Sequence, residues 1–383
     1  MRRLFSSPAR LHPLLIAGAV SGCLLSDDFE KVPAATGGAA PVPECPSLFS
    51  GNAPADCNQD LLYDNDNCCV TGRSCLGGDC VNGQCRAITL GTSPDSDEAV
   101  GIVPVGDWVV WTTGNGGQVL AVPRTGGDAV TLATIGATED ECTTHITTDG
   151  TYVYWVDYGG GAIRRVAVDP PGTMETIATV PNGLGGWGRI VVRDGLVFWA
   201  MGDSEGIWLA NADGSSTSPT MIAEAPAPYG IAVDDTHVYW AENGIDSAPT
   251  GKIRRLARAG INTGGEPEDL ETDEEQPGDL VIDDTHVYWL TRGGVVSRIR
   301  KDGSGGLEDL STEEHEPKAL RVDDVFVYWT DPEGTRVRQV RKNGEDLRSI
   351  VALDDGVFPQ GLAQDCDTLY FTADDRTVRM VPK

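Results

Sequence analysis

The sequence predicts an all-β protein whose residues 86–383 form a seven-bladed β-propeller. The first observation is a motif that recurs seven times, with 40 to 49 residues between successive copies. That period is typical of propeller blades, each built from four short strands. The second observation is composition: the 383 residues include 47 Gly and 23 Pro, which suits many strands joined by tight turns.

Each copy of the motif consists of an apolar strand, a turn that usually contains Asp, and a second strand that ends in an aromatic residue. The seven second strands end at Trp111, Trp155, Trp199, Trp240, Trp289, Trp329 and Phe371. Aromatics repeated in this way would also suit a stacking platform for a sugar. Packing between blades is the better explanation, because one ring at one fixed position per blade buries a large apolar surface.

The fourth copy shows how each blade is predicted from local pattern. Its strands are expected at Ile231–Val233, His237–Trp240, Lys252–Leu256 and Glu268–Leu270. Alternation places Val238 and Trp240 on one face of the blade, since successive side chains of a strand point to opposite faces. Pairs such as Asn343-Gly344 supply the residues that a tight hairpin turn needs.

The two ends of the propeller segment are expected to pair with each other. The last copy of the motif stops at Lys383 without a fourth strand, and Arg86–Leu90 precedes the first copy with the pattern of one strand. Pairing these segments would close the ring and remove exposed strand edges. The sequence therefore predicts seven blades rather than six.

Residues 1–22 resemble the signal peptide of a bacterial lipoprotein. A basic start leads to an apolar run that is too short to span a bilayer. The run ends in Val20-Ser-Gly-Cys23, which resembles a lipobox and implies that Cys23 is acylated. Leu24, in place of Asp, favours the outer over the inner membrane of the cell envelope. The alternative is an ordinary cleaved signal peptide. Residues 23–44 are expected to form a flexible tether.

Residues 45–85 are predicted to form a small disulfide-rich module. They contain seven cysteines in 41 residues, and an exported segment of this size cannot build a sufficient core without disulfides. Cys142 and Cys366 lie outside the module, and one of them is a candidate partner for the odd thiol. The pairing stays open at this point. A zinc site is not expected, because Cys-x-x-Cys pairs do not occur.

The charge of the chain limits its partners. The formal net charge is −29, and removing a leader that carries three Arg and no acid leaves −29 − 3 = −32. Such a field repels phosphate backbones and anionic lipid surfaces, which argues against nucleic-acid partners and against membrane contact other than through a lipid anchor. It favours an unknown protein, peptide or other ligand that is cationic.

The repeats resemble two groups of propellers. Tyr328-Trp-Thr-Asp331 is similar to the motif of the YWTD propellers of lipoprotein receptors. Val233-Asp-Asp-Thr-His-Val-Tyr-Trp240 is similar to the repeats of secreted bacterial propellers of unassigned role. The resemblance implies the fold, and it implies no partner because the matching residues are structural. YWTD propellers usually have six blades, so the predicted count departs from that pattern.

One end of the propeller is expected to carry the candidate ligand face. In a four-stranded meander, the loops after the second and fourth strands emerge on the same side. The carboxylates there include Glu139, Asp140, Glu141, Glu313, Glu314 and Glu316, and the aromatics are Tyr158, Trp187, Tyr229 and Phe358. This set suits a cationic ligand or a basic protein segment. The alternative is that acidic loops simply maintain solubility.

A catalytic function requires different residues from the same loops. His145 and His315 are the candidate ligands of a divalent metal. Calcium is a separate candidate for the loop carboxylates, because it prefers oxygen ligands. Some seven-bladed propeller lyases, of the virginiamycin B lyase type, use a His and a metal at the channel mouth, and the resemblance to them is one of architecture. No His-Glu-x-x-His motif is present. No catalytic residue is assigned.

The sequence thus favours a cell-envelope lipoprotein whose propeller is a non-catalytic binding or protein-interaction scaffold. The alternative is a propeller lyase or hydrolase with a divalent metal at the channel mouth.

Overall fold

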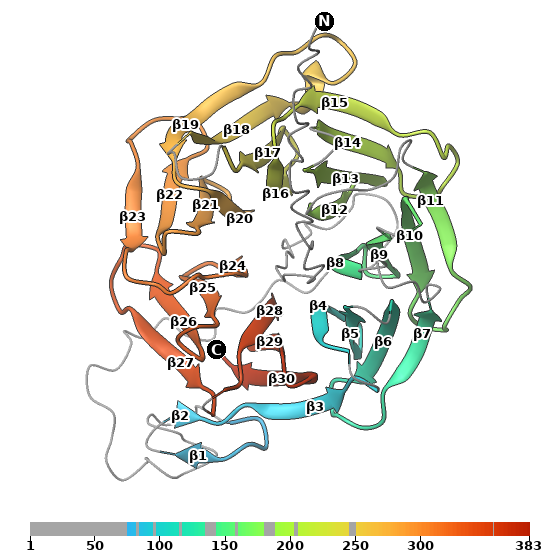
Figure 1. Ribbon diagram of the computed structural model, residues 1–383, viewed down its shortest axis with the longest axis vertical. Coiled ribbons are helices and arrows are strands. Elements are labelled where there is room, and N and C mark those ends of the chain that lie inside the picture. Colours follow the sequence, from blue (N-terminus) through green and yellow to red (C-terminus); the bar gives the residue numbers. More distant parts are fainter. Residues whose placement is uncertain are drawn as a thin grey trace, which may run out of the picture.

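The computed structural model shows seven four-stranded antiparallel sheets arranged radially around a central axis (Figure 1). The structure describes residues 75–81, 84–94, 97–114, 117–134, 143–157, 160–179, 188–202, 206–244, 250–354 and 356–383. The predicted signal peptide, Cys23, the tether and most of the cysteine-rich module lie outside these ranges. The predicted all-β, seven-bladed propeller is confirmed.

The strands follow the chain from the axis outward in each blade. Blades 1 and 2 comprise β4 (Ala99–Val105), β5 (Trp108–Thr113), β6 (Gln118–Pro123), β7 (Val130–Thr134), β8 (Thr143–Thr148), β9 (Tyr152–Asp157), β10 (Ala162–Ala167) and β11 (Glu175–Thr179). Blades 3 and 4 comprise β12 (Ile190–Arg193), β13 (Leu196–Met201), β14 (Gly206–Asn211), β15 (Thr220–Glu224), β16 (Pro228–Val233), β17 (His237–Glu242), β18 (Gly251–Ala257) and β19 (Glu268–Glu274). A short 3-10 helix, Arg258–Gly260, follows β18.

Blades 5 to 7 repeat this order, and the last blade is completed from the other end of the propeller segment. They comprise β20 (Pro277–Ile282), β21 (His286–Thr291), β22 (Val296–Arg300), β23 (Glu308–Ser311), β24 (Leu320–Val322), β25 (Phe326–Asp331), β26 (Arg336–Arg341), β27 (Arg348–Ala352), β28 (Pro359–Gln364), β29 (Thr368–Ala373) and β30 (Thr377–Pro382). The outer strand of blade 7 is β3 (Ile88–Thr92), which pairs with β30 from Ile88↔Met380 to Thr92↔Thr377. The predicted ring closure is confirmed.

The repeated aromatic residues fill the interior. The six Trp side chains and Phe371 are all fully buried within clusters of Val, Ile, Leu and Ala. Their indole N–H groups need acceptors, because a buried polar group without a hydrogen bond is destabilising. Trp240 donates to Glu242 at 2.9 Å, and Trp111 donates to the Ser93 hydroxyl at 3.0 Å. The motif aromatics are therefore core residues.

Charged residues in the turn between the first and second strands of the motif join neighbouring blades. In blade 5, the Tyr288 hydroxyl donates to Asp283 at 2.8 Å, and Lys342 of blade 6 approaches the same carboxylate at 2.7 Å. The same arrangement joins blades 4 and 5, 6 and 7, and 7 and 1, through Asp234–Lys301, Asp323–Lys383 and Asp365–Arg124. Four of the blade junctions are thus locked by an Asp that accepts from its own Tyr and from the next blade.

The described part of the cysteine-rich segment lies against the propeller. A disulfide joins Cys75 and Cys85, and β1 (Cys80–Val81) pairs with β2 (Gln84–Cys85) beside the outer strand β27 (Figure 1). Cys80 and Cys366 each take part in a disulfide as well. The buried cysteines share a hydrophobic cluster with side chains of blades 6 and 7. Within the described ranges, no helix has the length and apolar character needed to cross a membrane.

Candidate functional site

The loops that follow the second and fourth strands of each blade meet at one end of the propeller, which we call the loop end. In blades 4 to 7, the exposed charges at this end are mostly acidic. Among the residues that the structure describes at this end, the exposed carboxylates are Asp273, Glu275, Glu313, Glu316, Glu333 and Asp354, and the exposed guanidiniums are Arg292 and Arg376. Six acids against two arginines give this part of the surface a negative potential, which favours cationic ligands.

Glu314 does not belong to this exposed set, although the sequence placed it there. Its side chain is buried and accepts from the Trp329 indole at 3.0 Å, from Arg338 at 2.6 Å and from the Ser311 hydroxyl. Glu274 is buried in the same way and accepts from Trp289 at 2.9 Å. Burial raises the pKa of Glu274, and the Trp289 hydrogen bond opposes this effect. Both carboxylates serve the interior of the propeller.

The other predicted site residues that the structure describes occupy three different surroundings. Glu316 is exposed, has a positive φ of 53°, and lies 4.0 Å from Arg292. Phe358 is half-buried, and its N–H donates to Asp374 at 2.8 Å. The Tyr229 ring is half-buried with the Arg189 guanidinium 5.4 Å from its centre. The predicted residues Glu139, Asp140, Glu141, Tyr158 and Trp187 lie outside the described residues.

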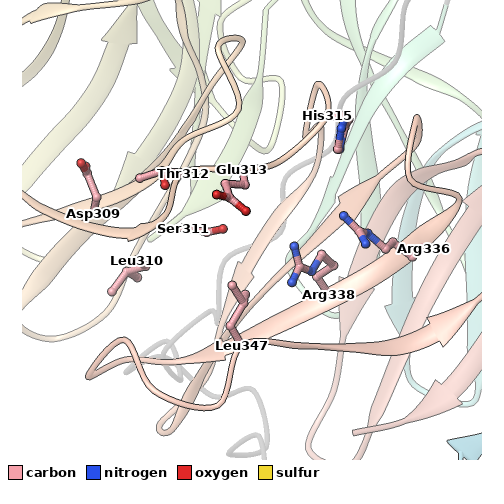
Figure 2. Close-up of a pocket in the computed structure, with 9 residues that line it drawn as sticks. All are labelled: Asp309, Leu310, Ser311, Thr312, Glu313, His315, Arg336, Arg338 and Leu347. Carbon is pink, nitrogen blue, oxygen red and sulfur yellow. The ribbon is translucent and has the colours of Figure 1, made fainter.

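A cavity of about 510 Å³ lies between blades 5 and 6. Figure 2 shows its two walls: Asp309, Ser311 and Glu313 from β23 and the following loop, and Arg336 and Arg338 from β26, with His315 at the rim. Leu310 and Leu347 supply the apolar part of the lining. Two predicted site residues, Glu313 and His315, therefore share one cavity.

A second charged cluster lies at the inner strands, next to the axis, and is fully buried. Asp279 of β20 lies 3.1 Å from Arg189, which precedes β12, and 3.9 Å from Arg321 of β24. The carboxylate also accepts the Leu280 and Leu320 N–H groups at 2.8 and 2.7 Å. A buried ion pair of this kind requires good hydrogen bonding to offset desolvation. The cluster joins the inner strands of blades 3, 5 and 6.

His145 lies beside this axial cluster, and His315 lines the cavity at the rim of blades 5 and 6. Burial lowers the pKa of His145 well below its usual range, and the positive charges of Arg189 and Arg321 lower it further. His315 is exposed, and its backbone N–H donates to the Asp331 carboxylate at 3.3 Å. The two histidines thus occupy separate surroundings. In the described part of the chain, no three His, Cys, Asp or Glu side chains form a group suited to a metal ion.

One motif deserves comparison with a hydrolase site. Gly202–Gly206 has the spacing Gly-x-Ser-x-Gly, which in α/β-hydrolases places a nucleophilic Ser on a turn between a strand and a helix. Here the flanking elements are β13 and β14, which pair antiparallel from Leu196↔Asn211 to Met201↔Gly206. The elbow requires a helix after the turn, so this match is not evidence for a hydrolase.

Sequence reasoning missed Arg189, Asp279 and Arg321. For Arg189 and Asp279, the signal was available at the residue that precedes the first-strand Ile or Leu paired with each motif aromatic. In four blades this position holds Gly or Ala: Gly101, Gly230, Ala319 and Gly361. In the other three it holds His145, Arg189 and Asp279. Large polar residues at a position that is otherwise small indicate a shared polar site.

Comparison with known proteins supports the fold. No family model and no curated protein sequence matches the chain. Virginiamycin B lyase from Staphylococcus aureus superimposes with a TM-score of 0.64 at 15% identity, covering 78% of this chain and 99% of that one. A streptogramin B lyase gives 0.64 at 14% identity, covering 78% and 97%. The designed protein Ika8 gives 0.53 at 12% identity, covering 77% and 99%. At these identities the likeness concerns architecture alone.

Proposed function

We propose that this protein is a lipid-anchored, non-catalytic binding scaffold of the bacterial cell envelope. Its loop end takes a cationic partner, such as a basic peptide or protein segment. The observation that carries the proposal is the excess of exposed carboxylates at the loop end of blades 4 to 7, where the described part of the chain has six against two exposed guanidiniums. Affinity for such a partner would be spread over several loops and would depend on ionic strength.

Charged residues elsewhere in the propeller have structural roles, and this favours a scaffold over an enzyme. The Asp residues of the motif turns hold neighbouring blades together, and Glu242, Glu274 and Glu314 accept from buried indoles. His145 is buried beside two arginines, and that positive environment disfavours both a protonated imidazole and a bound cation. These groups are unsuited to proton transfer with a substrate at the surface.

An oligolysine peptide tests the proposal. We expect binding that weakens as salt rises, and a loss of about tenfold or more when four loop-end carboxylates are neutralised together. The variant combines Glu275→Gln, Glu313→Gln, Glu316→Gln and Asp354→Asn. The matched control neutralises four exposed carboxylates in turns of the opposite end, Asp284→Asn, Asp302→Asn, Glu345→Gln and Asp367→Asn. Equal losses in the two variants would mean that only net charge matters, and the loop end would then not be a binding face.

A lyase or hydrolase with a divalent metal is the alternative, and metal binding decides it. The scaffold proposal expects weak metal binding that His145→Ala and His315→Ala leave unchanged. Tight binding of one divalent ion per chain, lost in both variants together with a turnover activity, would overturn the scaffold.

A further inference from the structure

The cavity between blades 5 and 6 has walls of opposite charge. On the blade 5 side, Asp309 and Glu313 are exposed carboxylates. On the blade 6 side, the guanidiniums of Arg336 and Arg338 face them (Figure 2). A cavity of about 510 Å³ falls within the size range of small-molecule sites, roughly 300 to 1,000 Å³. Leu310 and Leu347 give it an apolar part.

The basic wall is held in place from behind. Arg338 donates to Glu314 at 2.6 Å, and Arg336 donates to Asp331 at 2.7 Å; both carboxylates are buried. The carboxylates thus orient the two guanidiniums while leaving N–H groups unused. A guanidinium oriented in this way is well suited to a carboxylate, which accepts two parallel hydrogen bonds.

The junction between blades 3 and 4 offers a comparison within the same repeat. Blade 4 also has two basic residues at the equivalent positions, Lys252 and Arg254, but both pair with Asp269 of their own blade, at 2.7 and 2.6 Å. In blade 6 the residue opposite Arg338 is Ser349, which carries no charge. Blade 6 therefore lacks the carboxylate that blade 4 places opposite Arg254, and, among the described residues, the two guanidiniums of its basic wall are paired only with the buried carboxylates behind them.

The acidic wall differs in the same comparison. Asp309 lies opposite Ser297 in blade 5, and the equivalent residue of blade 3 is Met221, opposite Trp208. The junction between blades 3 and 4 therefore lacks an acid at the position of Asp309 and has Asp269 paired with both basic residues on the other wall. Only small changes within the same scaffold separate that junction from the charged cavity between blades 5 and 6.

We infer that the cavity between blades 5 and 6 binds a free amino acid as a zwitterion. Its ammonium group lies against Asp309 and Glu313, and its carboxylate lies against Arg336 and Arg338. The side chain contacts Leu310 and Leu347. The inference rests on the proposed function, because it takes this end of the propeller to be a binding region. It adds the class of ligand that one cavity binds.

Isothermal titration calorimetry with the common L-amino acids tests the inference. We expect at least one of them to bind. Its amide lacks the carboxylate charge and its N-acetyl derivative lacks the ammonium charge, so each should bind at least about tenfold more weakly. Binding of the amide as tightly as the amino acid would exclude a role for the basic wall. Failure of every amino acid to bind at millimolar concentration would overturn the inference.

Three variants separate the cavity from its surroundings. Glu313→Gln removes a charge from the acidic wall, and Ser349→Asp places beside Arg338 the carboxylate that Asp269 supplies beside Arg254. Both should weaken amino-acid binding about tenfold or more while leaving the melting temperature unchanged. Glu316→Gln, in the same loop but outside the cavity, should leave binding unchanged. Equal effects of Glu313→Gln and Glu316→Gln would contradict the assigned site.

The two proposals fail in different ways. If the wild type binds oligolysine but no amino acid, the scaffold proposal stands and the inference about the cavity is wrong. If the protein binds an amino acid, loses it on Ser349→Asp and does not bind oligolysine, the inference about the cavity stands and the proposed cationic partner is wrong.

Discussion

At the scale of single residues, one Asp in each of several motif turns organises a large part of the structure. The Asp283 carboxylate accepts the N–H groups of Thr285 and His286 at 2.7 Å, the Tyr288 hydroxyl at 2.8 Å and the Lys342 ammonium. It therefore closes its own turn, holds a core tyrosine and contacts the next blade. The second Asp of the turn, Asp284, is exposed. Two adjacent and chemically identical residues thus have different roles.

This difference predicts the behaviour of Asp283→Asn. The loss of the Asp283 charge should lower the free energy of unfolding at neutral pH by about 1 to 3 kcal/mol, because the substitution weakens charge-assisted hydrogen bonds and an ion pair. Urea unfolding measures the change. Asp284→Asn is the matched control and should have little effect. Similar destabilisation by both variants would show that the contacts of Asp283 contribute nothing of their own.

The stabilisation by Asp283 should also depend on pH. Burial alone would raise its pKa, but Lys342 and the turn N–H groups outweigh burial and hold the pKa well below its usual range. A depressed pKa in the folded state means that the stabilisation is complete above the unfolded pKa of about 3.9 and is lost as pH falls through the folded pKa. The gap between wild type and Asp283→Asn should therefore be constant above about pH 5 and shrink in stronger acid.

At the scale of elements, β3 is the strand that makes the ring continuous. It comes from the N-terminal side of the propeller segment and pairs with β30 at the C-terminal end of the chain. Leu90 is buried in the cluster formed with blade 1, so the strand also contributes to the core. The inner strands of neighbouring blades also pack closely. A Cβ at Gly230 would lie 2.6 Å from the carbonyl oxygen of Gly278 in the next blade, so this contact requires Gly.

Deletion of residues 86–91 should lower the free energy of unfolding by several kcal/mol. The deletion removes the outer strand of blade 7, exposes the edge of β30 and uncovers apolar surface worth about 25 cal/mol per Å². Thermal and urea unfolding of the purified protein measure the loss. A deletion of equal length before residue 75 is the control. An unchanged melting temperature would mean that ring closure by β3 contributes little to stability.

At the scale of the whole molecule, the net charge of the chain bears on the proposed lipid anchor. A chain that carries about −32 after loss of its leader, by the count above, is repelled by anionic lipid headgroups. Under the proposed lipid anchoring, attachment to a membrane would depend on the acyl chains at Cys23, and the residues between Cys23 and the propeller would act as a spacer. The proposed loop-end binding face would be presented away from electrostatic contact with the bilayer.

Labelling with palmitate tests this view of the whole molecule. We expect label in the wild type and none in Cys23→Ala, which should then leave the membrane fraction, because the acyl chains supply the membrane affinity. Cys366→Ala is a useful control, since that cysteine is disulfide-bonded in the propeller and should not affect acylation. Equal labelling of wild type and Cys23→Ala would contradict the lipoprotein assignment.

The sequence by itself determined the number of blades, the second strand of each blade and the closing role of residues 86–90, which overlap the observed strand β3 (Ile88–Thr92). These features depend on local alternation and on a period of 40 to 49 residues, both of which are visible along the chain. The same reasoning identified Glu313 and His315, which line a cavity. It did not separate Glu313 from Glu314, because a loop pattern does not show which of two adjacent carboxylates turns inward toward a buried Trp.

Only the tertiary structure decided which charged residues meet. Arg189, Asp279 and Arg321 come from three blades and converge because the ring brings their inner strands together at the axis. The cavity joins Glu313 of blade 5 to Arg338 of blade 6 across a blade junction. Such contacts depend on the curvature of the ring and on side-chain direction, which a repeat shared by every blade does not specify. The repeat determined the scaffold, and the departures from it acquired their partners only on folding.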